Sequence, residues 1–381
     1  MYSRHLQSEV ERLSLSFPVL SITGPRQSGK TTLCKMVFPQ YEYINLEQES
    51  VRVAIRTNPV EYLKQYNSGV ILDEAHYLPE VFSAIQVLVD EDKSRRFVLS
   101  GSSNFLLIQN ISQSLAGRVA ILRLLPFSLS ELGSAAAPLS TDTLMLRGFF
   151  PAIWGDNRPI WNVYDSYFST YIQRDVRLVT NIHDINLFTK FIRICAARVG
   201  NEFNSSAIAT EVGVSVKTIQ GWLGVLQTSY VAFTLQPYYR NLGKRLIKSP
   251  KIYFYDTGLL CYLLGLHTEQ DLAACPIRGA IFENMVVADR LKERFHHGLD
   301  NNLYFYRDKS HEVDLLQEEA MHVHATEIKS ATVIHPEFFK NLDYLRNLMQ
   351  NNILSTQVVY DGTIELPISH NGYINYRHFN Q

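Results

Sequence analysis

The chain has 381 residues, of which 46% are hydrophobic and 19% charged, and its formal net charge is −1 at pH 7. This composition excludes a disordered chain, and the length suits two or three globular domains. The small net charge excludes a global field that would draw the protein to nucleic acid or to an anionic membrane, so any basic surface must be local.

The four cysteines are far apart in the chain and form no C-x-x-C pair, which argues against a zinc site or a disulfide framework. We expect reduced thiols in the core. The N-terminal segment has a helical pattern, with Leu6, Val10 and Leu13 on one face, and no stretch approaches about eighteen uncharged apolar residues. The sequence therefore predicts a cytoplasmic protein without a membrane partner.

A glycine-rich loop is the first motif, and it follows an apolar run, residues 17–22, that is predicted as a strand. The pattern G-x-x-x-x-G-K-[ST] predicts a phosphate loop, in which backbone N–H groups face the phosphates, Lys30 reaches the β/γ oxygens and Thr31 ligates Mg²⁺. A helix predicted over 31–37 would point its positive end at the same phosphates. A simple glycine turn before a helix is the alternative. The predicted nucleotide-binding residues are Gly24, Pro25, Arg26, Gln27, Ser28, Gly29, Lys30, Thr31 and Thr32.

Alternating elements follow, with strands predicted over 41–46 and 69–72 and a helix around 58–66. This alternation indicates a parallel sheet flanked by helices. The second strand runs directly into Asp73 and Glu74. We expect Asp73 to hold Mg²⁺ through water and Glu74 to orient and polarise the attacking water. An acidic helix cap after a strand is the other interpretation of this pair.

A further strand, predicted over 96–100, ends in polar residues that include Ser102 and Asn104. Ligands bind such sheets at the carboxyl ends of the strands, so Asn104 is a candidate contact to the γ-phosphate or the water. The same residues would also suit an ordinary turn with a helix N-cap. Arg118 is a candidate cation for transition-state charge, acting in cis or across a subunit boundary, or else a surface arginine.

These motifs resemble the AAA-type ATPases that carry a C-terminal DUF4143 domain, and the resemblance covers nearly the whole chain. It implies a parallel sheet of the additional-strand type, ATP as the nucleotide, and a glutamate beside the metal-binding aspartate. The chain departs from the family pattern at one place. Residues 73–76 are Asp-Glu-Ala-His, ending at His76, where the family often has Asp-Glu-Ile-Gln. The stretches that carry the resemblance are residues 24–32, 71–76, 99–104, 115–118, 171–176, 240–245 and 253–259.

Helical patterns replace the alternation from about residue 147. Residues 204–233 resemble a helix-turn-helix with a second helix opened by Ser215, which suggests a winged-helix-like domain. Only Lys217, Thr218 and Gln220 would suit base recognition on that helix.

A local basic segment comes next and is interleaved with tyrosines at 238, 239 and 253. Such a segment would bind the phosphates of a nucleic acid. A solvated hairpin, or a surface docked on acidic parts of a neighbouring domain, explains it equally well. Its basic residues are Arg240, Lys244, Arg245, Lys248 and Lys251.

The C-terminal third places Glu283 on a predicted helix (279–295), followed by strands over 303–307, 311–316 and 325–330. Residues two apart in a strand share a face, so Glu327 and Lys329 should project together. Asp314, Glu327 and Glu283 would hold Mg²⁺, and Lys329 would position or polarise a water. The order of these residues is similar to that of the PD-(D/E)xK nuclease superfamily, which implies a restriction-endonuclease-like fold but not its activity.

We therefore expect an α/β protein with an AAA-like ATPase domain (1–150), a helical winged-helix-like domain (151–275) and a nuclease-like domain (276–381). ATP and Mg²⁺ are the expected cofactors. The nucleotide cycle is expected to control how the C-terminal parts engage DNA or RNA. The alternatives are a signalling or scaffold switch with an inert C-terminal module that docks on another protein, and a nucleic-acid-binding regulator without cleavage. The oligomeric state does not follow from the sequence.

Overall fold

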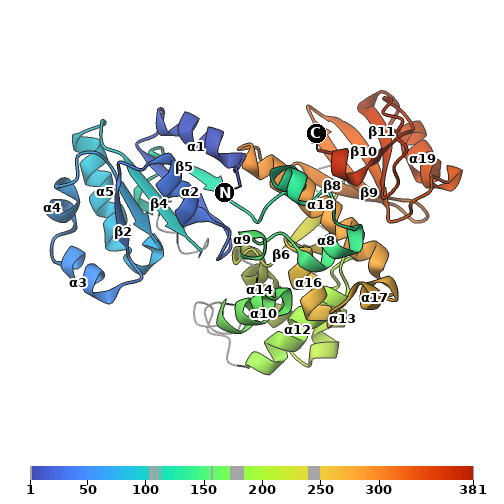
Figure 1. The fold of residues 1–381 in the computed structure, drawn as a ribbon, viewed down its shortest axis with the longest axis horizontal. Helices are drawn as coiled ribbons and strands as arrows, with labels where there is room; N and C mark the ends of the chain where they lie inside the picture. Colours follow the sequence, from blue (N-terminus) through green and yellow to red (C-terminus); the bar gives the residue numbers. More distant parts are fainter. Residues whose placement is uncertain are drawn as a thin grey trace. The chain divides into compact units, whose positions relative to one another are not determined.

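A computed structural model of the chain describes residues 2–102, 107, 111, 113–155, 158–171, 184–238 and 249–380 (Figure 1). The chain divides into two compact units. The first contains residues 1–127, 228–230 and 292–299, and the second contains 128–227, 231–291 and 300–381. In these described residues no helix has both the length and the apolar character needed to cross a membrane.

The first unit is an alternation of strands and helices, coloured blue to cyan in Figure 1. Its helices are α1 (Leu6–Ser14), α2 (Lys30–Val37), α3 (Glu49–Thr57), α4 (Pro59–Lys64), the 3-10 helix η1 (Ala75–Tyr77) and α5 (Glu80–Glu91). Its strands are β1 (Val19–Thr23), β2 (Glu42–Asn45), β3 (Val70–Asp73), β4 (Phe97–Gly101) and β5 (Val119–Arg123).

All five strands are parallel, in the order β2-β3-β4-β1-β5. Strand β4 lies between β1, which precedes the glycine-rich loop, and β3, which ends at Asp73. This is the expected sheet with an additional strand. Because the strands are parallel, their carboxyl ends meet at one edge, and the polar residues that follow β1, β3 and β4 gather there.

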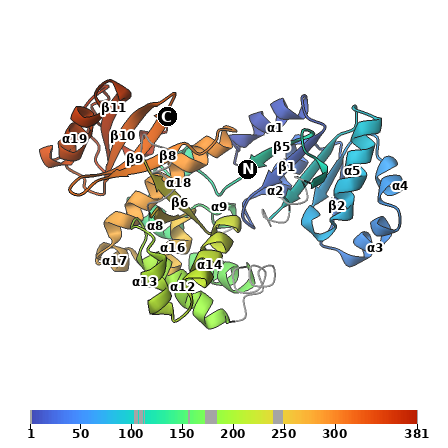
Figure 2. The ribbon, with the colours of Figure 1, turned by 180° about the vertical axis from the view of Figure 1, so that it is seen from behind.

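Side chains that alternate along the strands pack on two helical layers. Leu20 and Ile22 of β1 join the core under α1 and α2, whereas Val70 and Leu72 of β3 join the core under α3, α4 and α5. Both faces are covered, as buried parallel sheets require. Figure 2 shows this layering from behind.

The second unit begins with helices and continues into a mixed sheet. Its first elements are α7 (Leu129–Leu132), η2 (Gly133–Ala135), α8 (Thr141–Arg147), α9 (Pro151–Gly155), α10 (Ile160–Tyr167), α12 (Ile185–Ala197), α13 (Ser205–Val212), α14 (Val216–Thr228), β6 (Ala232–Pro237), β7 (Lys251–Phe254), α16 (Thr257–Leu264) and α17 (Glu269–Ala273). Its remaining elements are α18 (Arg278–His296), β8 (Leu303–Arg307), β9 (Glu312–Glu319), β10 (His322–Lys329), η4 (Pro336–Phe339), α19 (Lys340–Met349), η5 (Gln350–Asn352), β11 (Ile353–Tyr360), β12 (Gly372–Asn375) and η6 (Tyr376–His378).

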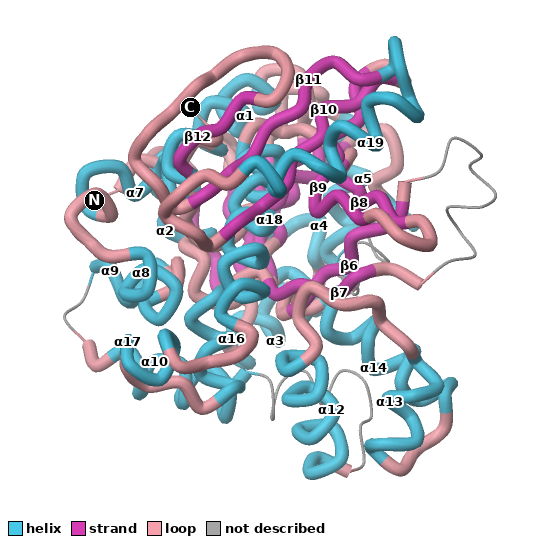
Figure 3. The backbone as a smooth tube through the Cα atoms, turned by 90° about the vertical axis from the view of Figure 1, so that its right-hand side faces the viewer, coloured by secondary structure: helices cyan, strands magenta, loops and turns pink. Residues whose placement is uncertain are grey.

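One seven-stranded sheet joins the middle of the chain to its C-terminal third, in the order β12-β11-β10-β9-β8-β6-β7. The hairpin of β6 and β7 enters this sheet because β6 pairs in parallel with β8. Helix α19 packs against β9, β10 and β11 (Figure 3). The predicted boundary near residue 275 therefore falls inside one compact unit, and the three-part division remains a prediction.

Candidate functional site

The glycine-rich loop joins β1 to α2, as the sequence predicts. Its backbone has positive φ at Gly24 (152°), Gln27 (62°) and Gly29 (92°). A Cβ atom at Gly24 would lie 2.0 Å from the backbone oxygen of Leu124, so only glycine fits there. The remaining loop residues surround this turn: Pro25 supplies a carbonyl, Arg26 pairs with Glu47 at 3.3 Å, the Ser28 side chain is buried, and Thr32 is exposed.

Lys30 is buried and folds back over the loop. Its Nζ donates to the carbonyl oxygens of Gly24 (2.9 Å) and Pro25 (2.7 Å). Burial lowers the pKa of Lys30, and the nearby Glu74 and Asp73 carboxylates partly offset that effect. The ammonium group thus occupies the middle of the loop, beside both carboxylates.

Asp73 is the centre of a hydrogen-bond network at the strand edge. Its Oδ2 accepts from the hydroxyls of Thr31 (2.8 Å) and Tyr43 (2.7 Å). Its Oδ1 accepts from the Ser100 hydroxyl and from the Glu74 backbone N–H (3.2 Å). The sequence predicts that Thr31 and Asp73 both serve Mg²⁺, but it carries no local signal for the roles of Tyr43 and Ser100. Oxygen donors of this kind suit a hard cation such as Mg²⁺.

Glu74 has a left-handed backbone, with φ 53° and ψ 46°. This conformation is uncommon for a residue with a side chain and often marks functional sites. Its Oε2 accepts from the Ser102 N–H (3.1 Å) and hydroxyl (3.3 Å) and lies 3.3 Å from Nδ1 of His76. Burial raises the pKa of Glu74, and the Lys30 charge opposes that rise.

Arg4 supports the glycine-rich loop, which the sequence alone does not indicate. The buried guanidinium donates to the backbone oxygens of Ser28 and Leu125, each at 2.7 Å. It therefore links the start of the chain to the glycine-rich loop. A helical N-terminal pattern is visible in the sequence, but nothing near Arg4 indicates this contact.

Arg118 does not reach the loop within its own chain. It precedes β5 at the amino edge of the sheet, where its carbonyl accepts from the Val19 N–H at 3.3 Å. A five-residue strand separates this edge from the loop, a distance of about 16 Å. The side chain pairs with Asp90 at 2.7 and 2.8 Å. Arg118 therefore lies far from the loop of its own chain, which argues against action in cis, and a role across a subunit boundary or that of a surface arginine remains a prediction. Asn104 lies outside the described residues.

A second cluster forms at β9 and β10. The register that pairs Thr326 with Leu315 places Asp314 beside Glu327. Lys329 Nζ lies 2.8 Å from Glu327 Oε1 and 3.5 Å from Asp314 Oδ2, so the predicted E-x-K residues do share a face. Burial and the Asp314 charge raise the pKa of Glu327 to about 8, with Lys329 opposing the rise.

Glu283 joins this cluster from α18, through two residues of β7. It accepts from the Tyr253 hydroxyl at 2.6 Å and lies 3.3 Å from Lys251 Nζ. Burial and the Asp314 charge raise the pKa of Glu283 to about 7, with Lys251 and Tyr253 opposing the rise. Lys251 is only 2% exposed and also pairs with Glu312 at 2.6 Å. Its expected place in a surface phosphate-binding segment is wrong, because its side chain lies in the interior beside Glu283, Glu312 and Phe305.

The three carboxylates do not converge as closely as ligands of one bound ion. Among the described residues, the one group of histidine, cysteine or acidic side chains compact enough to hold a metal ion lies elsewhere. The ammonium groups of Lys251 and Lys329 lie beside these carboxylates instead. The other basic residues of the expected phosphate-binding segment, Arg240, Lys244, Arg245 and Lys248, lie outside the described residues, as does Tyr239.

Two helices meet at a tight turn in the middle of the chain, as predicted. Gly213 ends α13 with φ 90°, and the Ser215 hydroxyl accepts from the Thr218 N–H at 3.1 Å before α14. The hairpin β6/β7 follows. Whether this arrangement binds nucleic acid remains a prediction. All four cysteines are free, three of them buried.

Comparison with known proteins gives three family-model matches. Residues 16–133 match a model described as an AAA domain, and residues 278–379 match the domain of unknown function DUF4143. Residues 139–270 match another domain of unknown function, DUF8612. Two uncharacterized proteins, from Mycobacterium tuberculosis and Mycobacterium bovis, are each 30% identical over 359 residues, covering 92% of this chain and 78% of the relative. The chain belongs to the AAA–DUF4143 family.

Solved structures similar to this AAA–DUF4143 protein are more remote. A Walker-type ATPase of Pyrococcus abyssi is 15% identical, with a TM-score of 0.44, covering 69% of this chain and 96% of that one. The ORC2 protein of Aeropyrum pernix in its ADP form is 12% identical, with a TM-score of 0.30, covering 60% and 86%. The family match identifies residues 16–133 as an AAA-type ATPase domain.

Proposed function

We propose that this protein hydrolyses ATP with Mg²⁺ at the edge formed by β1, β3 and β4. The observation that carries the proposal is the convergence of Lys30, Thr31, Asp73 and Glu74, which come from separate segments of the chain. Phosphoryl transfer depends on positioning and charge stabilisation rather than on covalent chemistry. The cluster provides a cation, a set of oxygen ligands and a carboxylate base.

Each residue has a distinct role in this proposal. The Lys30 ammonium would exchange the Gly24 and Pro25 carbonyls for phosphate oxygens, and Thr31 and Asp73 would hold Mg²⁺. The ion would neutralise the charge of the β- and γ-phosphates. Glu74 orients the attacking water and accepts its proton, while the Ser102 N–H fixes the carboxylate. A raised pKa makes Glu74 a stronger base than an ordinary glutamate.

The test is ATP turnover, measured by phosphate release, in Lys30→Ala and Glu74→Gln. We expect each rate to fall at least about 100-fold. Binding of a fluorescent ATP analogue should be lost in Lys30→Ala and retained in Glu74→Gln, because only the former removes a phosphate contact. Glu91→Gln, at the exposed end of α5, is the control. Wild-type rates in both variants would overturn the proposal.

We also propose that the nucleotide cycle controls engagement of nucleic acid by the second unit, and that its acidic cluster hydrolyses phosphodiesters. Two observations support this second function. Asp314 and Glu327 are buried beside Lys329, with Glu283 close enough to interact with Asp314. The four residues follow the order expected of such nucleases. Their oxygens suit Mg²⁺. An ion would compete with Lys251 and Lys329 for these oxygens, so cleavage should depend strongly on metal concentration.

Plasmid nicking with Mg²⁺ or Mn²⁺ tests this second function. Cleavage should occur with wild type, disappear in Asp314→Ala/Glu327→Ala, and persist in Glu337→Ala, which changes an exposed glutamate of η4. Absence of cleavage by wild-type protein on DNA and RNA, with and without ATP, would instead favour the scaffold or regulator alternative.

A further inference from the structure

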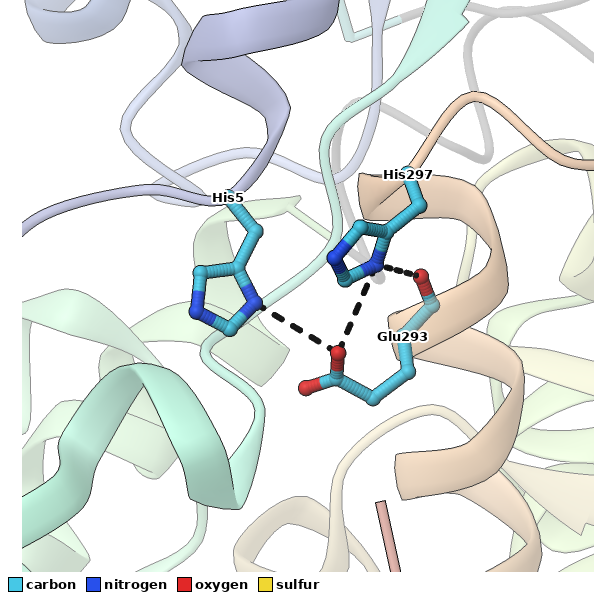
Figure 4. A group of neighbouring side chains, drawn as sticks. All are labelled: His5, Glu293 and His297. Atoms are coloured by element: carbon cyan, nitrogen blue, oxygen red, sulfur yellow. Dashed lines mark hydrogen bonds and ion pairs between the residues drawn. The ribbon is translucent and has the colours of Figure 1, made fainter. Parts of the chain in front are cut away.

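A group of two imidazoles and one carboxylate lies apart from both clusters described above. His5 immediately precedes α1, Glu293 lies in the last turn of α18, and His297 directly follows that helix. Residues 293 and 297 are one helical turn apart and therefore project from the same side. All three belong to the first compact unit. Figure 4 shows the two rings facing the same carboxylate oxygen.

The distances suit ligands of a single ion. Nδ1 of His5 lies 3.4 Å from Glu293 Oε2, and Nδ1 of His297 lies 3.5 Å from the same oxygen. One ligand atom from each residue can be chosen so that all three lie within 4.8 Å of one another. Zinc ligands about 2.0–2.1 Å from a tetrahedral ion are about 3.3 Å apart. Both imidazole-to-carboxylate distances are thus close to the spacing that the ion requires.

We propose that His5, Glu293 and His297 bind a divalent transition metal of the zinc class. Imidazole nitrogen with one carboxylate oxygen is a donor set that zinc accepts and that Mg²⁺ does not favour. Glu293 is 7% exposed, and a buried carboxylate attracts a cation more strongly than one in water. The imidazoles are 33% and 56% exposed. The ion would therefore reach the site from solvent and keep at least one water ligand.

Metal binding at this site should depend on pH. Nδ1 of His297 also lies 2.7 Å from the backbone oxygen of Glu293, so binding the ion through this nitrogen would replace the hydrogen bond that it donates when protonated. A metal ion needs the lone pair of a neutral imidazole, so metal and proton compete for these rings. Occupancy would join residue 5 to residues 293–297 and should raise the thermal stability of the folded chain.

The experiment uses the full chain, stripped with EDTA and titrated with Zn²⁺ against a chromophoric chelator. Because ions can also bind the acidic clusters, the informative quantity is the difference between variants. His5→Ala and His297→Ala should each bind one equivalent less than wild type, whereas His370→Ala, an exposed histidine of the second unit, should match it. Glu293→Gln should weaken binding at least about 10-fold.

Two further measurements separate metal loss from misfolding. The metal-free variants should unfold at the wild-type temperature, and only wild type and His370→Ala should gain stability when Zn²⁺ is added. Co²⁺ absorption bands should appear in the same two proteins and not in His5→Ala. Equal zinc stoichiometry in wild type, His5→Ala and His297→Ala would overturn the proposal and leave an ordinary ion pair around Glu293.

Discussion

The Thr31 hydroxyl donates to Oδ2 of Asp73 over 2.8 Å, although 42 positions separate the two residues in the chain. Asp73→Asn would place an amide among donors that now converge on a carboxylate. We expect Mg²⁺ to support ATP turnover only at about 10–100-fold higher concentration. Unmatched donors should also lower the free energy of unfolding by about 1–3 kcal/mol. Magnesium-dependent rates and urea unfolding measure the two effects. Glu91→Gln, at the exposed end of α5, should change neither.

Gly24→Ala should unfold more easily and bind ATP poorly. The added Cβ would meet the Leu124 carbonyl oxygen, a backbone atom that cannot move away cheaply. Gly117→Ala is the matched control, because Gly117 also has positive φ (76°) but an added Cβ there would meet no atom within 4 Å. Gly117→Ala should lower the free energy of unfolding by only about 1–2 kcal/mol, through the strained backbone conformation. Equal unfolding curves for the two variants would show that the close contact is unimportant.

The acid limb of the ATPase pH profile should report Glu74. Its pKa is raised by burial, and a base acts only when deprotonated. The rate constant kcat should therefore fall as pH decreases through a value above about 4.3, the ordinary glutamate pKa. Steady-state rates across pH, with thermal unfolding followed in parallel, provide the measurement. A limb at or below the ordinary value would argue against Glu74 as the base.

Arg118 should act only on a neighbouring subunit. We expect Arg118→Ala to lower kcat at least about 10-fold, since a transition-state arginine commonly contributes much more. Mixing Arg118→Ala with Lys30→Ala should give more turnover than either variant alone, because a mixed interface combines one intact loop with one intact arginine. Arg56→Ala, a half-exposed arginine of α3, is the control. Unchanged activity of Arg118→Ala would leave only the Asp90 ion pair as its role.

Glu327→Gln should stabilise the protein at alkaline pH. The folded protein holds the Glu327 proton up to about pH 8, whereas an unfolded chain releases it near about 4.3. The stability associated with this proton is fully present below that lower value and is lost as pH rises to about 8. Glutamine mimics the protonated form, so the variant should gain at least about 1 kcal/mol at pH 9 relative to pH 4. Glu337→Gln should show no such gain in denaturant titrations.

Local patterns in the sequence predict the elements that carry the nucleotide site. An apolar run, two glycines and a short amphipathic segment suffice for β1, the loop and α2, and strand β3 is recognisable from its apolar residues before Asp73. The insertion of β4 between β1 and β3 follows from the family resemblance and is confirmed by the strand pairing.

The contacts that the sequence does not predict are those between segments far apart in the chain. Lys251 stands among basic residues and tyrosines, which is typical of a surface, but the folded chain places its side chain in the interior beside Glu283. Tyr43, Ser100 and Arg4 likewise acquire their partners only when distant segments meet. Periodicity indicates which side of a strand is apolar, but it does not identify the neighbour across the sheet.

The contact of Arg4 with the Ser28 carbonyl has a practical consequence for purified protein. An affinity tag fused directly ahead of residue 1 would introduce bulk and charge close to a bond that holds the glycine-rich loop. Preparations that carry the tag at opposite ends of the chain are therefore expected to differ in apparent ATP affinity, and turnover rates should be compared only between preparations tagged at the same end.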